Sequence, residues 1–187
     1  MISSLGALAE HGMSAATFAQ SLEAASAEFR IIPQGEFRSI DGRPEGLPGW
    51  KMDSVIAGGI AADLAARDAL VIDYEHQTLR VKQNGQPAPA AGWLSRVTWR
   101  EGLGLFAVDV KWTDKAKQMI GAGEYRFISP VFTFDKTSGN VGRLIGLGLT
   151  NNPGLTGLTD LSKVALSLSL STEDAEKLRR AFPGVFR

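Results

Sequence analysis

Alternating hydrophobic and polar positions mark two neighbouring segments in the middle of the chain. In Leu103–Lys111 every second side chain is hydrophobic, and Gly92–Trp99 alternates in the same way. A period of two residues is typical of a strand with one buried face. The link Arg100-Glu101-Gly102 is short and contains glycine. The two segments are therefore predicted to form a β-hairpin.

Further strands are predicted on both sides of this hairpin. Leu70–His76 begins with three apolar residues and ends in polar ones, so it is expected to carry His76 from a buried strand to a rim. A shorter extended piece is expected near the N-terminus, and three more strands are expected toward the C-terminus. These are Phe29–Pro33, Tyr125–Phe134, Arg143–Leu149 and Val164–Leu170.

Four helices are predicted from apolar residues at intervals of three and four. In the second of them, Asp53 is the expected N-cap, Val55, Ile56, Ile60 and Leu64 form the expected buried stripe, and Gly58-Gly59 suggests close packing against another backbone. Thr113 is the expected N-cap of the third. The four helices are Ser14–Arg30, Asp53–Arg67, Thr113–Ile120 and Thr172–Phe182.

These elements favour an α+β fold, a mostly antiparallel β-barrel or curved sheet with flanking helices. The proline-rich segment Gln77–Ala91 is expected to be a loop or flap over the surface, because proline cannot donate to a strand ladder. We expect residues 1–30 to form a helical leader, 31–160 the core, and 161–187 a tail of one strand and one helix.

Composition narrows the function classes. The chain has 187 residues, and its 20 basic and 20 acidic side chains give a formal net charge of +0. Neither nucleic acid nor an anionic membrane is therefore an expected partner. The absence of cysteine removes thiolate nucleophiles, disulfides and cysteine zinc sites. The sequence has no run of about 18 apolar residues, so it predicts no membrane span.

Two polar residues are the main candidates for chemistry. Only His11 and His76 can shuttle protons near neutral pH, and His11 lies in a leader rich in glycine and alanine. Ser129 precedes Pro130, which restrains it to extended geometry and makes its strand an edge, a bulge or a place where something approaches. A serine next to an imidazole can become a nucleophile. The plainer interpretation is a half-exposed histidine and a hydrogen-bonded strand serine without catalytic duty.

A triad needs a third group to orient the imidazole, and spacing does not choose it. The candidates are Asp73, Glu75, Asp109, Glu124 and Asn151; Asp73 and Glu75 point away from His76 unless the strand bends.

Two competing chemistries are weaker. One is metal-assisted hydrolysis by Asp73, Glu75 and His76. Neighbouring residues of a strand point to opposite faces, so these side chains would not surround one ion. No cofactor or metal is therefore expected. Three tryptophans are better explained as core residues than as a base-stacking platform, because they lack surrounding basic residues and the chain lacks net positive charge; they are Trp93, Trp99 and Trp112.

Five motifs in register resemble the family of the Mu-like prophage I protein. They cover roughly residues 31–158. In chain order they are Ile32–Arg38 (IPQGEFR) with Asp41–Pro44 (DGRP), Val71–Thr78 (VIDYEHQT), Gly85–Trp93 (GQPAPAAGW), Glu124–Phe132 (EYRFISPVF) and Leu149–Pro153 (LTNNP).

The resemblance implies a phage head-maturation protease, a serine endopeptidase that cleaves scaffold protein, itself and sometimes major capsid protein. It would act inside assembling proheads in the cytoplasm of the bacterial host. More distantly it implies an assemblin-like β-barrel with flanking helices. Carried over by motif, His76 is the general base and Ser129 the nucleophile.

The chain departs from related prohead proteases before the Asn-Pro region. Those proteases often carry an acidic residue there, whereas Leu144–Gly148 has none. Asn151 is therefore the first choice for the third triad member and Asp73 the second. Backbone N–H groups, helped by Arg126 or Arg143, are expected to hold the oxyanion. The missing acid also leaves open a non-catalytic scaffolding or capsid-associated protein on the same fold.

Overall fold

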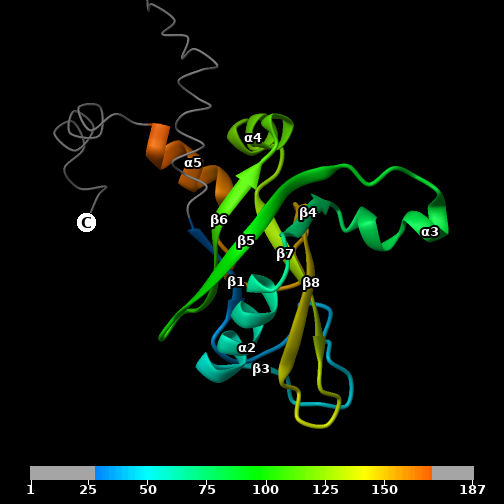
Figure 1. Cartoon of the computed structure of the whole chain (residues 1–187), viewed down its shortest axis with the longest axis vertical. Coiled ribbons are helices and arrows are strands. Elements are labelled where there is room, and N and C mark those ends of the chain that lie inside the picture. Colours follow the sequence, from blue (N-terminus) through cyan, green and yellow to red (C-terminus); the bar gives the residue numbers. More distant parts are fainter. Residues whose placement is uncertain (1–27, 170–187) are drawn as a thin grey trace, which may run out of the picture.

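The computed structural model describes residues 28–169, and a curled six-stranded sheet organises them (Figure 1). The strand order is β1-β6-β5-β4-β8-β7, so β1 and β7 are the two edges. Neighbours pair antiparallel except β4 and β8, which run parallel. The strands are β1 Glu28–Pro33, β4 Leu70–Tyr74, β5 Ala90–Arg100, β6 Gly104–Trp112, β7 Phe127–Phe134 and β8 Val141–Thr150.

Smaller elements flank this sheet. A two-stranded sheet joins β2 Gly35–Phe37 to β3 Trp50–Met52. The helices are α2 Ser54–Ala65, the 3₁₀ turn η1 Gln77–Leu79, α3 Val81–Asn84, α4 Asp114–Gly121 and α5 Leu161–Ser169. The predicted α+β class, with a curved and mostly antiparallel sheet and flanking helices, is confirmed.

The predicted hairpin and two helix starts are also confirmed. β5 and β6 pair from Gly92 opposite Trp112 to Arg100 opposite Gly104. The Asp53 carboxylate accepts a hydrogen bond from the Ile56 N–H at 2.8 Å and caps α2. The Thr113 hydroxyl caps α4 in the same way. Local capping chemistry thus fixes where these helices begin.

Helix α2 corrects two expectations about its faces. Ile60 and Leu64 are buried as predicted, but Val55 is 81% exposed, and Ala57 is buried instead. A Cβ built at Gly58 or Gly59 would meet nothing within 4 Å. Close packing therefore does not explain the glycine pair, because α2 turns these two residues toward solvent.

Two further predictions, at the ends of the described region, are wrong. Val164–Leu170 was predicted as a strand, but Leu161–Ser169 is the helix α5. In this helix Leu161 and Ala165, four residues apart, lie on one buried face. Glu28–Arg30 belongs to β1, not to the predicted first helix. The rest of that helix and the predicted helix Thr172–Phe182 lie outside the described residues.

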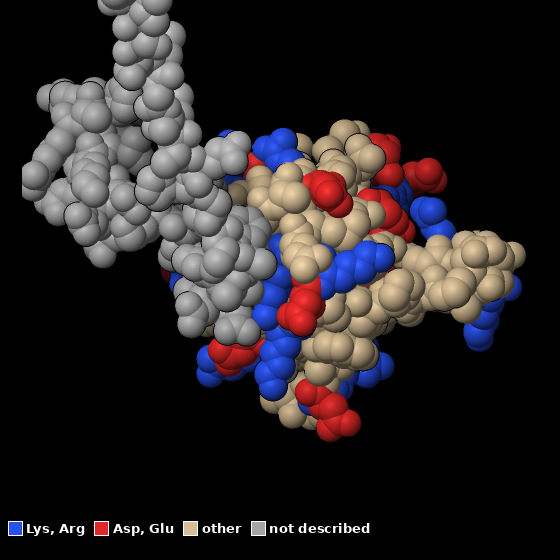
Figure 2. Space-filling model, turned by 90° about the horizontal axis from the view of Figure 1, so that it is seen from above, with Lys and Arg blue, Asp and Glu red and all other residues tan. Residues whose placement is uncertain are grey.

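The segment between β4 and β5 projects from the molecule as an arm (Figure 1). The predicted loop Gln77–Ala91 contains η1 and α3, and its last two residues begin β5. Leu79 and Val81 remain exposed on it. Over the face seen in Figure 2, acidic and basic side chains are intermixed, as expected for a chain with a net charge of +0. Within the described residues, none of the helices is long and apolar enough to cross a membrane.

Candidate active site

The end of β4 turns sharply to present His76. Regular strand geometry stops at Tyr74, and both Glu75 (φ 54°) and His76 (φ 57°) have left-handed backbone conformations. Two consecutive non-glycine residues in this region are uncommon, and such backbone conformations cluster at functional sites. The Glu75 N–H donates to the Leu149 carbonyl at 3.1 Å, which ties the turn to β8. The strand therefore bends where His76 leaves it.

This turn lays the imidazole over a glycine of β8. A Cβ added to Gly148 would lie 2.6 Å from Cε1, 2.7 Å from Nδ1 and 2.9 Å from Nε2 of His76. Since real Cβ atoms do not make such contacts, any side chain at this position would occupy the place of the ring. Gly148 therefore provides the space in which the imidazole lies.

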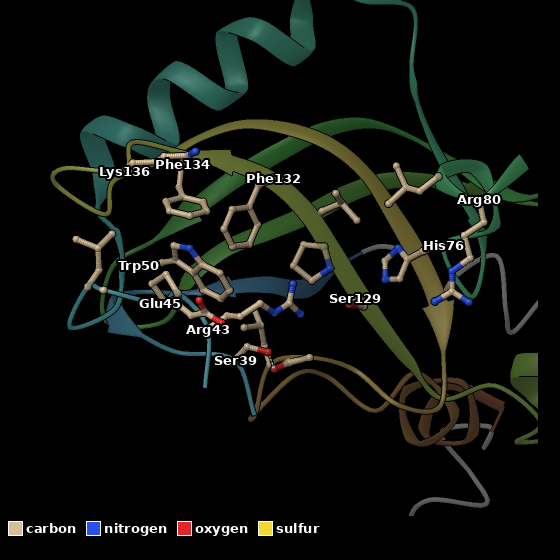
Figure 3. Close-up of a pocket in the computed structure, with 18 residues that line it drawn as sticks. Ser39, Arg43, Glu45, Trp50, His76, Arg80, Ser129, Phe132, Phe134 and Lys136 are labelled. Atoms are coloured by element: carbon tan, nitrogen blue, oxygen red, sulfur yellow. Dashed lines mark hydrogen bonds between the residues drawn. The ribbon is translucent and has the colours of Figure 1, made fainter. Parts of the chain in front are cut away.

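Ser129 lies directly across the ladder from the same glycine. In the β7–β8 pairing, Ser129 is the partner of Gly148. Cross-strand partners project to the same face, with Cβ atoms about 4.5–5.5 Å apart. The Ser129 side chain and the His76 ring are therefore neighbours on one face of the sheet, and both line the same cavity (Figure 3). Ser129 is 9% exposed.

Aromatic and charged residues line the cavity. Its volume is about 830 Å³. At the end away from His76, Trp50 packs edge-on against Phe132, with ring centroids 5.1 Å apart, and against Phe134 at 5.8 Å (Figure 3). Its charged lining residues are Arg43, Glu45, Arg80 and Lys136. An elongated, partly apolar cleft next to a serine and a histidine suits a peptide chain.

The electrostatic surroundings keep His76 in its neutral form at neutral pH. Burial is the largest influence and lowers the pKa of His76 below its usual 6.5. The carboxylates of Asp73 and Glu75 act in the opposite direction, and Arg80 lowers the pKa slightly more. Because a neutral imidazole is the form that accepts a proton, His76 is poised as a general base.

Asp73 is buried beside this turn. Its side chain is 3% exposed, and Oδ2 accepts a hydrogen bond from the Thr78 N–H at 2.6 Å. Oδ1 is buried and has no hydrogen-bond partner among the described residues. The carboxylate thus spans the turn that contains His76. Glu75, by contrast, accepts a hydrogen bond from the Thr150 hydroxyl at 2.7 Å.

None of the five third-member candidates lines the cavity. The Asn151 amide donates to the Glu124 carbonyl at 2.7 Å, and no hydrogen bond within the described part of the chain joins Asn151 to His76. Asp109 pairs with Arg96 on the hairpin, 2.7 Å apart. His76 and Ser129 are therefore brought together, whereas Asn151 is directed elsewhere. Its assignment stays a prediction.

The two arginines predicted to assist the oxyanion have other contacts. Arg126 pairs with Asp160, and Arg143 pairs with Asp63. The cavity is lined instead by Arg43 and Arg80, which lie in segments that hydrophobic periodicity describes only as loops. Sequence reasoning missed both, and it missed the role of Gly148. A glycine two residues from another glycine within a strand was the available signal for close approach by another group.

No group of three or more histidine, aspartate or glutamate side chains within residues 28–169 is arranged to hold an ion.

Comparison with known proteins adds an independent line of observation. The family described as the Mu-like prophage I protein, N-terminal domain, matches residues 29–162. Protease I of Escherichia phage Mu is 40% identical over an alignment of 148 residues that covers 74% of this chain and 40% of that protein. The Mu-like prophage FluMu I protein of Haemophilus influenzae is 34% identical over an alignment of 160 residues that covers 80% of this chain and 43% of that protein.

The chain thus spans about two fifths of the length of these relatives. No solved structure matches it. The matched region contains both His76 and Ser129.

Proposed function

Because the chain belongs to the family of the Mu-like prophage I protein, whose N-terminal domain matches residues 29–162, we propose that it is a phage head-maturation serine endopeptidase. The observation that carries the proposal is the His76 ring lying over Gly148, the cross-strand partner of Ser129. The name Protease I of the phage Mu relative supports a phage protease role on separate grounds.

In the proposed reaction, the Ser129 hydroxyl attacks the carbonyl carbon of a peptide bond and His76 takes its proton. The imidazolium then gives the proton to the leaving amine, which departs as the acyl-enzyme forms. Water, deprotonated by His76, hydrolyses this ester and regenerates the serine. Pro130 has no N–H, so the backbone donors that hold the oxyanion come from elsewhere in the cavity wall.

We assign the orienting role to Asp73 in preference to Asn151. The buried Asp73 carboxylate raises the pKa of His76 against the effect of burial, as an orienting acid does, and its bond to the Thr78 N–H stabilises the turn. Asn151 remains the alternative. Asp73 acts as a positioning residue, since none of its described contacts reaches the serine.

The substrates that follow from the family resemblance are scaffold protein, the chain itself and major capsid protein. Cleavage would take place inside the assembling prohead, in the cytoplasm of the bacterial host.

A non-catalytic scaffolding or capsid-associated protein is the second candidate function. One observation favours it: among the described residues, neither ring nitrogen of His76 has a hydrogen-bond partner to orient it. An enzyme of this kind normally holds its histidine by such a bond.

A pair of serine variants separates the two candidates. Ser129→Ala should reduce cleavage of co-expressed scaffold protein by more than about 10⁴-fold, because the nucleophile is gone. Ser95→Ala, an exposed serine on β5, should leave it unchanged. Circular dichroism checks that both remain folded, and a fluorophosphonate probe should label the wild type but not Ser129→Ala. Equal cleavage by both variants would overturn the proposed mechanism.

A further inference from the structure

The charged residues that line the cavity are mostly basic, whereas acidic and basic residues balance in the whole chain. Arg43, Arg80 and Lys136 line the cavity together with a single acid, Glu45, although the chain has a formal net charge of +0. Arg43 is already paired with Asp41, at 2.9 Å. The remaining cations favour a ligand with negative charge.

Arg80 is the cavity-lining cation whose charge acts on His76. It follows η1 at the base of the projecting arm, and Figure 3 shows its guanidinium beside His76, at the end of the cavity opposite Trp50. Its positive charge is felt by the imidazole. Among the described residues, its side chain has no acidic partner. A guanidinium in this position can bind a carboxylate through two parallel hydrogen bonds.

The opposite end of the cavity is apolar. Trp50 and Leu155 are 7% and 5% exposed, and the rings of Phe132 and Phe134 are half-buried beside them. Their packing leaves a hydrophobic surface open to the cavity. A bulky aliphatic or aromatic side chain would bury apolar area there without leaving a polar group unpaired.

Ser129 lies between these two ends in Figure 3. An extended peptide advances about 3.3 Å per residue, so a chain passing Ser129 reaches the Arg80 end and the Trp50 end within a few residues of the scissile bond. The two ends would therefore contact different sides of the cleavage site.

Building on the proposed protease function, we infer that the substrate is an extended peptide that places an Asp or Glu against Arg80 on one side of the scissile bond and a bulky apolar side chain against Trp50 and Phe132 on the other. Arg80 is then a specificity-determining residue. A single-stranded nucleic acid fits the cavity less well, because Trp50 is edge-packed and almost fully buried and offers no face for a base to stack on.

Binding to an inactive background tests this inference without requiring cleavage. In Ser129→Ala, fluorescence anisotropy would compare three series of labelled ten-residue peptides. The first pairs Glu with Leu around a central bond, the second replaces Glu by Gln, and the third replaces Leu by Ala. We expect the Glu–Leu series to bind about tenfold more tightly than either other series. Replacing Glu by Gln loses a charge-assisted contact, and replacing Leu by Ala loses buried apolar area.

Two charge reversals on the same arm provide the matched comparison. Adding Arg80→Glu should abolish the preference for Glu over Gln. Adding Lys82→Glu, an exposed position on α3 that does not line the cavity, should preserve it. Because both variants change the net charge equally, a general electrostatic effect would appear in both. Circular dichroism confirms that each is folded.

The outcomes separate this inference from the protease proposal. Equal affinity for Glu and Gln peptides, or equal effects of Arg80→Glu and Lys82→Glu, would overturn the inference even if scaffold cleavage depends on Ser129. Displacement of the Glu–Leu peptide by a single-stranded decamer of deoxythymidine would overturn it in favour of nucleic acid. If the peptides bind selectively but the wild type cleaves nothing, the peptide-binding inference stands and the protease proposal is wrong.

Discussion

Two antiparallel ladders of the same sheet differ in regularity. β5 and β6 keep one register along their whole pairing, whereas β7 and β8 shift register twice after Val131. The regular ladder lies inside the sheet, with buried residues such as Leu94 and Leu105, both 0% exposed. The irregular ladder ends at the edge strand β7, and Ser129 and Gly148 lie on it. Ser129 and Gly148 pair before these shifts, so the space at the site comes from a glycine that leaves room for the His76 ring and not from the change of register.

The largest effect should come from filling the space beneath the imidazole. Gly148→Ala would place a Cβ within 2.9 Å of three ring atoms of His76. Because the ring moves more easily than the strand, we expect a folded protein whose cleavage rate falls by about 10³-fold, within the range for losing general-base catalysis. Gly146→Ala is the matched control, since its Cβ meets only the Val71 carbonyl, at 3.7 Å. Equal rates for the two variants would contradict the proposed role of Gly148.

A smaller effect, on stability, is expected in the regular ladder. Leu94→Ala should lower the free energy of unfolding by about 2–5 kcal/mol, because it removes a fully buried side chain and leaves a cavity. Cleavage per folded molecule should stay near the wild-type rate. Urea unfolding followed by circular dichroism, with activity normalised to the folded fraction, measures both. A selective loss of activity would show that the two ladders are not separate in function.

The smallest effect concerns the turn beside the irregular ladder. Asp73→Asn removes a negative charge that raises the pKa of His76, so the pKa should fall further below 6.5. Since the neutral base is the active form, the acid limb of kcat/KM should move to lower pH, while the plateau drops about 10- to 100-fold. Asp53→Asn, the N-cap of α2, is the control for the same chemical change. An acid limb that does not move would remove Asp73 from the mechanism.

Much of the regular part of this fold could be predicted from periodicity and caps. The hairpin of β5 and β6, the N-caps Asp53 and Thr113, and an edge or bulge at Ser129-Pro130 all depend on local physics that the sequence displays directly. The alternation at 164–170 misled because leucine-serine repeats fit either a strand or one side of a helix.

The site could be predicted only in part. The residue types of His76 and Ser129 and the family motifs identified the candidate pair, but periodicity describes Asp73, Glu75 and His76 only for a regular strand, and the strand bends there. The left-handed turn at 75–76 breaks the alternation of a strand, and it contains no glycine that would have indicated a turn in the sequence. Arg80 escaped notice for a related reason: nothing local indicates that a loop arginine lies beside a histidine of the preceding turn.

Pro130 has a further consequence at the border of the sheet. A strand at the border of a sheet exposes unpaired backbone groups, and a neighbouring molecule can attach to them and start an aggregate. β7 is such a border strand, and at Pro130 it lacks the N–H that an incoming chain would need. The proline next to Ser129 therefore discourages lasting attachment of a second molecule, so that a chain lying along this border can leave again.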